Sequence, residues 1–307
     1  EQKSPAEINE VFAYNDRFLA ITYSAAAVGA IVLIFNLFRI GGNRFVQGLS
    51  SVLALAAAIM LLVFALRIYE RLKDTPRARL LWISLSIGFG LWAFLEAIRL
   101  IVLVVSPAPH FSVLNWLWVI GYLPLFYGLY LRYIDLENPP TARQKQMVWG
   151  GLGLGLVYLF VAQIRPLLGG QSPSLGGAIA GLLYALADLG LLFLLGNILL
   201  SLWGKFGGPW KYFFIAIGLK FLGESIVQFP SNFGPGFLLS FANFFYYAWY
   251  GFAAFGSFMY DTALAYQFQP SEPIIVKEEL SPNASALLFT DEQDNVIKSS
   301  INFRYIT

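Results

Sequence analysis

Five ionisable residues stand inside long apolar runs, where a charge is costly. Glu96 and Arg99 lie in one run, Asp188 lies in a second, and Lys220 and Glu224 lie in a third. A charged side chain at the centre of a bilayer costs about 2.5–3.5 kcal/mol on insertion scales. These side chains must therefore face a protein interior or a wet cavity, where they could hold a ligand or a cation, or respond to protons.

The spacing of these residues predicts which of them meet. Glu96 and Arg99 are three residues apart, and Lys220 and Glu224 are four apart, so each pair shares one face of a helix. Asp188 has no partner within its own run. We predict a polar pocket between the third, sixth and seventh apolar segments, with a net charge of −1 if every group is ionised. The alternative is that the two pairs only fix helix register and bind nothing.

The composition is typical of a membrane-embedded chain. It has 307 residues, of which 58% are hydrophobic and 12% are charged, and its mean hydropathy is +0.64. Soluble domains carry about 25% charged residues, so a cytosolic enzyme and a disordered chain are both excluded. A net charge of +2 gives no basis for nucleic-acid binding. With no cysteine and one histidine, His110, we expect no metal site and no cofactor.

Eight apolar segments are long enough, at about 20 residues each, to cross a bilayer. They cover residues 18–40, 46–67, 80–105, 113–134, 147–165, 175–203, 211–229 and 236–265. In lipid the backbone must satisfy its own hydrogen bonds, which predicts α-helices, and runs without alternation exclude a β-barrel. The predicted fold class is an all-α polytopic membrane protein with eight transmembrane helices over residues 18–266, after an N-terminal arm of residues 1–17.

Lysine and arginine gather on one side of this predicted bundle. The N-terminal arm and the loops after the second, fourth and sixth segments hold 12 of them. The opposite side holds three, namely Arg39, Arg44 and Arg165. The positive-inside rule then predicts that both termini are cytoplasmic. The five intramembrane charges would lie between the middle of the membrane and its outer leaflet.

The composition changes after residue 266. Residues 267–283 have the character of a linker, and residues 284–307 follow a pattern of strand, polar turn and strand. A two-stranded hairpin is marginal alone. We therefore expect it to belong to a larger sheet, supplied by sequence after Thr307 or by a partner.

Two parts of the chain resemble bacterial membrane sensor proteins. The hairpin resembles the opening of a PAS domain through Thr290-Asp291, Val296-Ile297 and Ile301-Asn302. Residues 88–98 resemble the Trp-Ala-x-x-Glu helix of eight-helix sensor modules, and residues 121–125 and 184–188 also fit those modules. Such modules precede PAS, histidine kinase or diguanylate cyclase domains in the bacterial inner membrane.

The resemblance implies a sensory role in signal transduction, such as a two-component system. The intramembrane pocket would pass its state to a cytoplasmic PAS-linked output. The expected partners are the lipid bilayer, a small or lipophilic ligand, and a second copy or another subunit bound through membrane helices. We expect no catalytic site within residues 1–307, because the chain lacks a P-loop and a Ser–His–Asp arrangement. A kinase or cyclase domain would follow Thr307.

Three other classes stay open at this point. The chief alternative is a non-catalytic structural subunit of a larger bioenergetic membrane complex. A transporter would suit the internal charges, although no inverted repeat is visible. A retinal protein using Lys220 as its Schiff-base lysine is the third, although the sequence around that lysine does not resemble rhodopsins.

Overall fold

The computed structural model describes residues 16–105, 112–136, 139–168, 175–202, 207–227 and 237–267. Within these ranges all regular secondary structure is helical. The helices are α2 (Asp16–Phe38), α3 (Asn43–Arg71), α4 (Pro76–Val105), α5 (Ser112–Ile134), α6 (Ala142–Leu159), the π-helix η1 (Phe160–Ile164), α7 (Arg165–Leu168), α8 (Leu175–Ser201), α9 (Gly207–Val227) and α10 (Phe237–Gln267). Since α6, η1 and α7 follow one another directly, the described chain forms eight rods, one for each apolar segment of the sequence.

Four of the described helices are long and apolar enough to cross a membrane. They are the segments Arg44–Arg71, Pro76–Val105, Trp116–Ile134 and Ile179–Ser201. The sequence prediction of an all-helical membrane protein is confirmed in this coarser form. The predicted linker, the predicted hairpin and His110 lie outside the described residues.

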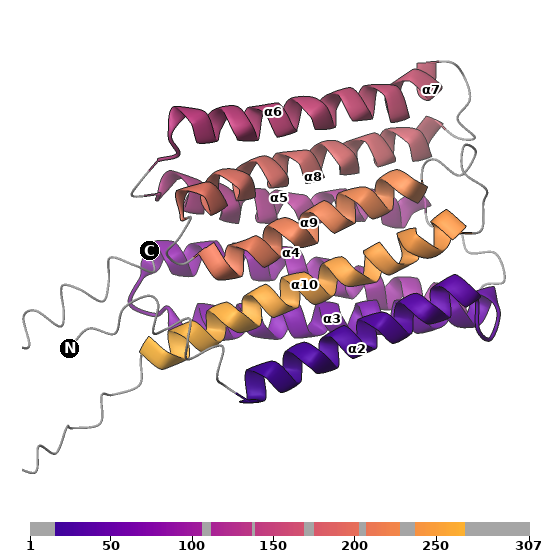
Figure 1. Ribbon diagram of the computed structural model, residues 1–307, viewed down its shortest axis with the longest axis horizontal. Helices are drawn as coiled ribbons and strands as arrows, with labels where there is room; N and C mark the ends of the chain where they lie inside the picture. Colours follow the sequence, from indigo (N-terminus) through magenta and orange to yellow (C-terminus); the bar gives the residue numbers. More distant parts are fainter. Residues whose placement is uncertain are drawn as a thin grey trace, which may run out of the picture.

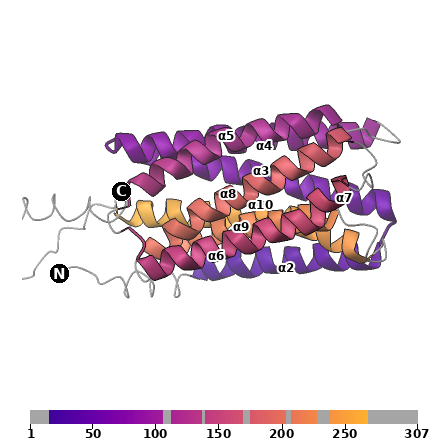
Figure 2. The ribbon, with the colours of Figure 1, turned by 90° about the horizontal axis from the view of Figure 1, so that it is seen from above.

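Six of the rods close into a ring (Figures 1 and 2). Around it, α3 packs on α4, α4 on α5, α5 on α8, α8 on α9, α9 on α10, and α10 on α3 again. Outside this ring, α2 lies against α10, and α6 lies against α8. The beginning of α2 and the end of α10 lie at the same end of the bundle in Figure 1.

Aromatic side chains fill the inside of the ring. Near the end of the bundle where α10 ends, Trp82 contacts Tyr260 and Trp210, with ring centroids 5.0 Å and 6.3 Å away. Farther along the ring, Trp92 and Trp249 meet edge to face at 5.2 Å. Trp82, Trp92 and Trp249 are all 0% exposed. The interior is therefore a packed core, in which any polar group must find partners among side chains.

The outward faces of the helices are apolar. Val105, Leu154 and Leu123 are examples, with 77%, 74% and 68% of their surface exposed. A soluble monomer rarely exposes a continuous apolar surface of this kind. Contact with lipid explains why apolar side chains point outward while charges point inward.

Candidate functional site

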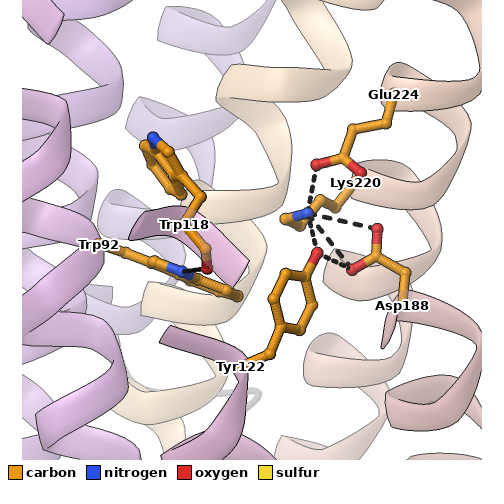
Figure 3. A network of polar contacts seen from close by, with 6 residues as sticks. All are labelled: Trp92, Trp118, Tyr122, Asp188, Lys220 and Glu224. Atoms are coloured by element: carbon orange, nitrogen blue, oxygen red, sulfur yellow. Dashed lines mark hydrogen bonds and ion pairs between the residues drawn. The ribbon is translucent and has the colours of Figure 1, made fainter. Parts of the chain in front are cut away.

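Four polar side chains from three helices meet inside the ring (Figure 3). The ammonium group of Lys220 on α9 donates hydrogen bonds to the hydroxyl of Tyr122 on α5 and to the carboxylate of Glu224. It also lies 3.3 Å from both carboxylate oxygens of Asp188 on α8. The Tyr122 hydroxyl in turn donates to Oδ1 of Asp188 at 2.6 Å. We call these four residues the Lys220 network.

The ammonium group is the centre of this network. A lysine has three N–H donors, and here they face three different side chains. The aromatic rings of Tyr122, Trp92 and Tyr184 also surround the nitrogen, with centroids 4.8, 5.6 and 5.6 Å away. Such ring faces attract a cation. Lys220 is 2% exposed and is still fully supplied with partners, as a buried charge requires.

The two carboxylates of the network differ in their surroundings. Asp188 is 0% exposed, and both of its oxygens face Lys220. Glu224 is 15% exposed, and within the described residues its Oε2 has no hydrogen-bond partner. One ammonium therefore faces two carboxylates, and Glu224 is the member with an oxygen still able to take a proton or a cation.

A proline inside α5 lies close to Tyr122. Pro124 is inside this helix, two residues after the tyrosine. Proline has no N–H to donate to the carbonyl one turn earlier, and its ring crowds that carbonyl, which bends a helix. The tyrosine of the network thus sits where its helix deviates most easily from straight geometry.

Glu96 and Arg99 form a separate pair on α4. Their charged groups are 3.7 Å apart, and Glu96 is 0% exposed. The guanidinium group of Arg99 lies over the ring of Tyr246 at 4.6 Å, and the ring of Tyr250, one turn farther along, contacts that of Tyr246 at 6.4 Å. Both tyrosines belong to α10, so this pair faces the last helix of the ring.

The structure places the five predicted residues in two groups. It brings Asp188, Lys220 and Glu224 into contact, and it leaves Glu96 and Arg99 in their own pair. All five lie in the ring or at its inner edge. Aromatic contacts connect the two groups, since Trp92, which faces Lys220, contacts Trp118 at 6.0 Å, and Trp118 contacts Tyr246 at 6.4 Å.

Sequence reasoning missed the tyrosines of both groups. It placed the pocket between the third, sixth and seventh segments, whereas the fourth, α5, supplies Tyr122. One signal in the sequence could have found them. Tyr122 follows Glu96 by 26 residues, and Tyr250 follows Glu224 by the same interval.

A second feature lies at the end of the ring where α10 ends. A cavity of about 550 Å³ opens there, and its lining includes Asp74, Arg77, Arg132 and Asp135. The cavity also touches Trp82, Trp210 and Tyr260, which separate it from the Lys220 network. None of the five predicted residues lines this cavity.

The chemistry of the site is that of charge and protons. Among the described residues, no group of three or more histidine, cysteine, aspartate or glutamate side chains could hold a metal ion. The network does contain two carboxylates, one amine and one phenol within hydrogen-bonding distance. Such a cluster can take up or release a proton, or exchange a small cation.

Comparison of the chain with family models, with curated proteins and with solved structures finds no match.

Proposed function

We propose that the chain is a membrane-embedded sensor module of the bacterial inner membrane, with both termini in the cytoplasm. The Lys220 network is its responsive site, and α10 carries the response toward a cytoplasmic PAS-linked output. The observation that carries the proposal is a buried ammonium shared by two carboxylates and a tyrosine from three helices.

The network supports a switching role because its charges do not balance. With every group but the tyrosine ionised, two negative charges face one positive charge. Protonating one carboxylate, or adding a cation beside it, balances the set and changes the attraction between α5, α8 and α9. A stimulus shifts a two-state equilibrium only if it favours one state, and a change of one charge in a dry interior does so.

All eight rods would span the bilayer in this proposal. The helix α9 has 21 residues, which at about 1.5 Å each gives roughly the 30 Å thickness of the hydrocarbon core. It packs between α8 and α10 within the ring. Its charges Lys220 and Glu224 lower its hydropathy but face inward, so lipid does not meet them.

The helix α10 is placed to carry the response. It packs along α9, and its residue Tyr246 contacts Trp118 at 6.4 Å and lies beneath the guanidinium group of Arg99 at 4.6 Å. At its other end Asp261 forms an ion pair with Arg71 of α3 at 2.7 Å. Movement at the network would therefore shift a 31-residue helix whose end precedes the predicted linker.

Hydrogen exchange tests this proposal. The whole 307-residue chain is placed in lipid nanodiscs, and amide protection factors over residues 255–267, which are corrected for the intrinsic pH dependence of exchange, are measured between about pH 5 and pH 9. We expect protection at this end of α10 to change with pH in the natural chain and to lose that change in K220M.

The matched control is K211M. Lys211 is exposed and lies on the same helix, so its substitution should leave the pH profile of α10 as it was. A profile that is flat in the natural chain, or that is unaffected by K220M, would contradict the proposal. A structural subunit, the chief alternative, predicts that flat profile.

A further inference from the structure

The sequence of α4 recurs in α9. Without a gap, identical residues stand 128 positions apart. The pairs are Trp82 and Trp210, Ile87 and Ile215, Gly90 and Gly218, Leu91 and Leu219, Glu96 and Glu224, and Ile98 and Ile226. Trp92 and Lys220 occupy equivalent positions in this alignment, and both are buried.

The same interval relates α5 to α10. Tyr122 and Tyr250 are 128 residues apart, as are Gly128 and Gly256. Tyr122 is 2% exposed and Tyr250 is 0% exposed. The interval is the same for both helices, so the two helix pairs align with each other without an insertion or deletion.

The two helix pairs also pack in the same way. A methyl group added at Gly128 would lie 3.1 Å from the carbonyl oxygen of Leu81, and one added at Gly256 would lie 3.0 Å from that of Pro209. Leu81 and Pro209 are themselves 128 residues apart. Each glycine thus lets α5 or α10 approach α4 or α9 at the equivalent place.

The ring places the two pairs opposite each other. Its order is α3, α4, α5, α8, α9 and α10, so α4 faces α9, and α5 faces α10. In Figure 1, α4 and α9 run in one direction and α5 and α10 run back. Equivalent residues meet at the centre, since Trp82 contacts Trp210 at 6.3 Å and the Lys220 ammonium lies 5.6 Å from the Trp92 ring.

We propose that α4–α5 and α9–α10 are two copies of one unit, related by a twofold axis that runs through the centre of the ring, parallel to the helices. Glu96 with Tyr250 is then the second copy of the site formed by Glu224 with Tyr122. Trp92 stands where Lys220 supplies an amine in the first copy, and Arg99 supplies the cation from the other side. In the first copy Lys220 contacts both the carboxylate of Glu224 and the hydroxyl of Tyr122. In the second copy Arg99 pairs with Glu96 at 3.7 Å and lies over the ring of Tyr246, one helical turn before Tyr250.

The repeated unit would exist whether or not the chain is a sensor. It gives Glu96 and Tyr250 a role, since they occupy the positions of Glu224 and Tyr122 in the other unit. Each polar cluster would then join the unit α4–α5 to the unit α9–α10.

Exchanging the two equivalent residues tests the proposal. The thermal midpoint of the full chain in detergent is measured for K220W, W92K/K220W and W92M/K220W. We expect K220W to lower the midpoint, because two buried carboxylates lose their ammonium and a larger ring enters. The amine introduced by W92K would stand four residues before Glu96, as Lys220 stands before Glu224, and should recover at least half of the loss.

The variant W92M/K220W separates charge from volume. Methionine relieves the crowding without supplying an amine, so we expect it to recover clearly less than W92K does. Equal recovery by the two double variants would overturn the proposal, because the position would then accept any slender side chain.

A second comparison keeps the test decisive if K220W fails to fold. We expect W92K alone to keep the midpoint within about 5 °C of the natural chain. We expect W249K to lower it far more, because Trp249 is equally buried but Ala253, not a carboxylate, stands four residues on. Equal losses in W92K and W249K would contradict the assignment of a second site at Glu96.

Discussion

At the scale of single residues, Lys220 explains why charges persist inside an apolar ring. Taking an ion out of water costs several kcal/mol, and the loss is offset only where partners are close and well aligned. Lys220 has Tyr122, Asp188 and Glu224 around one nitrogen. The network is therefore a single unit, and each member depends on the others.

Removing the tyrosine hydroxyl tests this dependence. The variant Y122F leaves Asp188 and Lys220 each short of one hydrogen bond while keeping the ring in place. Hydrogen bonds to charged groups contribute about 1.5–3 kcal/mol, and we expect a loss of that size in the free energy of unfolding. Urea or heat denaturation of the full chain in detergent measures it.

The control for this loss lies on the same helix. Tyr127 of α5 is 49% exposed, so Y127F should change the free energy of unfolding by less than about 0.5 kcal/mol. If Y122F proves no more damaging than Y127F, the hydroxyl of Tyr122 is not part of a stabilising network.

At the residue scale the sequence predicted part of this site. Charges inside apolar runs identified Glu96, Arg99, Asp188, Lys220 and Glu224, because lipid leaves a charge no alternative to the protein interior. Pairing within a helix also follows from spacing. The contact between Asp188 and Lys220 joins two helices, and nothing in the local sequence encodes which helix faces which.

At the scale of helices, the apolar runs predicted the rods but not their ends. The second run covers 46–67, whereas α3 extends from Asn43 to Arg71, because a helix can continue through the polar residues on either side of an apolar run. The fifth run starts at 147, yet α6 begins at Ala142. Its start is fixed by a capping box in which Thr141 and Gln144 exchange side-chain hydrogen bonds.

Close approach between helices depends on two equivalent glycines. A methyl group at Gly128 or Gly256 would press on a backbone carbonyl 3.1 or 3.0 Å away. Backbone cannot yield as a side chain does, so we expect both G128A and G256A to lower the free energy of unfolding. The expected loss is about 1–3 kcal/mol each, as for other overpacked sites, and denaturation of the full chain measures it.

An open glycine supplies the comparison for that pair. Gly153 of α6 has no side chain or neighbouring helix within 4 Å of the position a methyl would take. There G153A should be neutral or stabilising by up to about 1 kcal/mol, since alanine favours a helix more than glycine does. If one of G128A and G256A lowers the free energy of unfolding and the other does not, the two helix pairs do not pack alike.

At the scale of the whole molecule, the ring separates two polar regions by an aromatic core. The Lys220 network lies against the ring of Trp92. The cavity of about 550 Å³ lies against Trp82 and Trp210, nearer the end of the bundle where α10 ends. The cavity wall contains Arg132 and Tyr260, which occupy equivalent positions in the two units. Most of its lining comes from α4, α5 and the turns beside them, and Trp210 of α9 and Tyr260 of α10 complete it.

Cysteine labelling tests which end faces the cytoplasm. Because the 307 residues contain no cysteine, single substitutions give a clean signal. A cysteine in place of Arg39, in the turn after α2, should react with a membrane-impermeant maleimide in intact spheroplasts. One in place of Asp74, in the turn before α4, should react only after the membrane is opened, and the reverse pattern would invert the topology.

The global arrangement was the least predictable part of the structure. A closed ring of six helices depends on contacts such as that of α10 with α3, which lie far apart in the sequence. Long-range packing of this kind leaves only weak traces in one sequence. The repeat between α4 and α9 is one such weak signal, and it can be recognised once the structure places Trp82 beside Trp210.

In the proposed sensor, the charge state of the Lys220 network sets the position of α10. Spin labels on cysteines in place of Glu70 and Ala263 report the distance between the ends of α3 and α10 in nanodiscs. The variant E224Q imitates a protonated Glu224 without changing its shape, and double electron–electron resonance should show a shifted distance distribution relative to the natural chain. Identical distributions for the natural chain, E224Q and K220M would contradict the account.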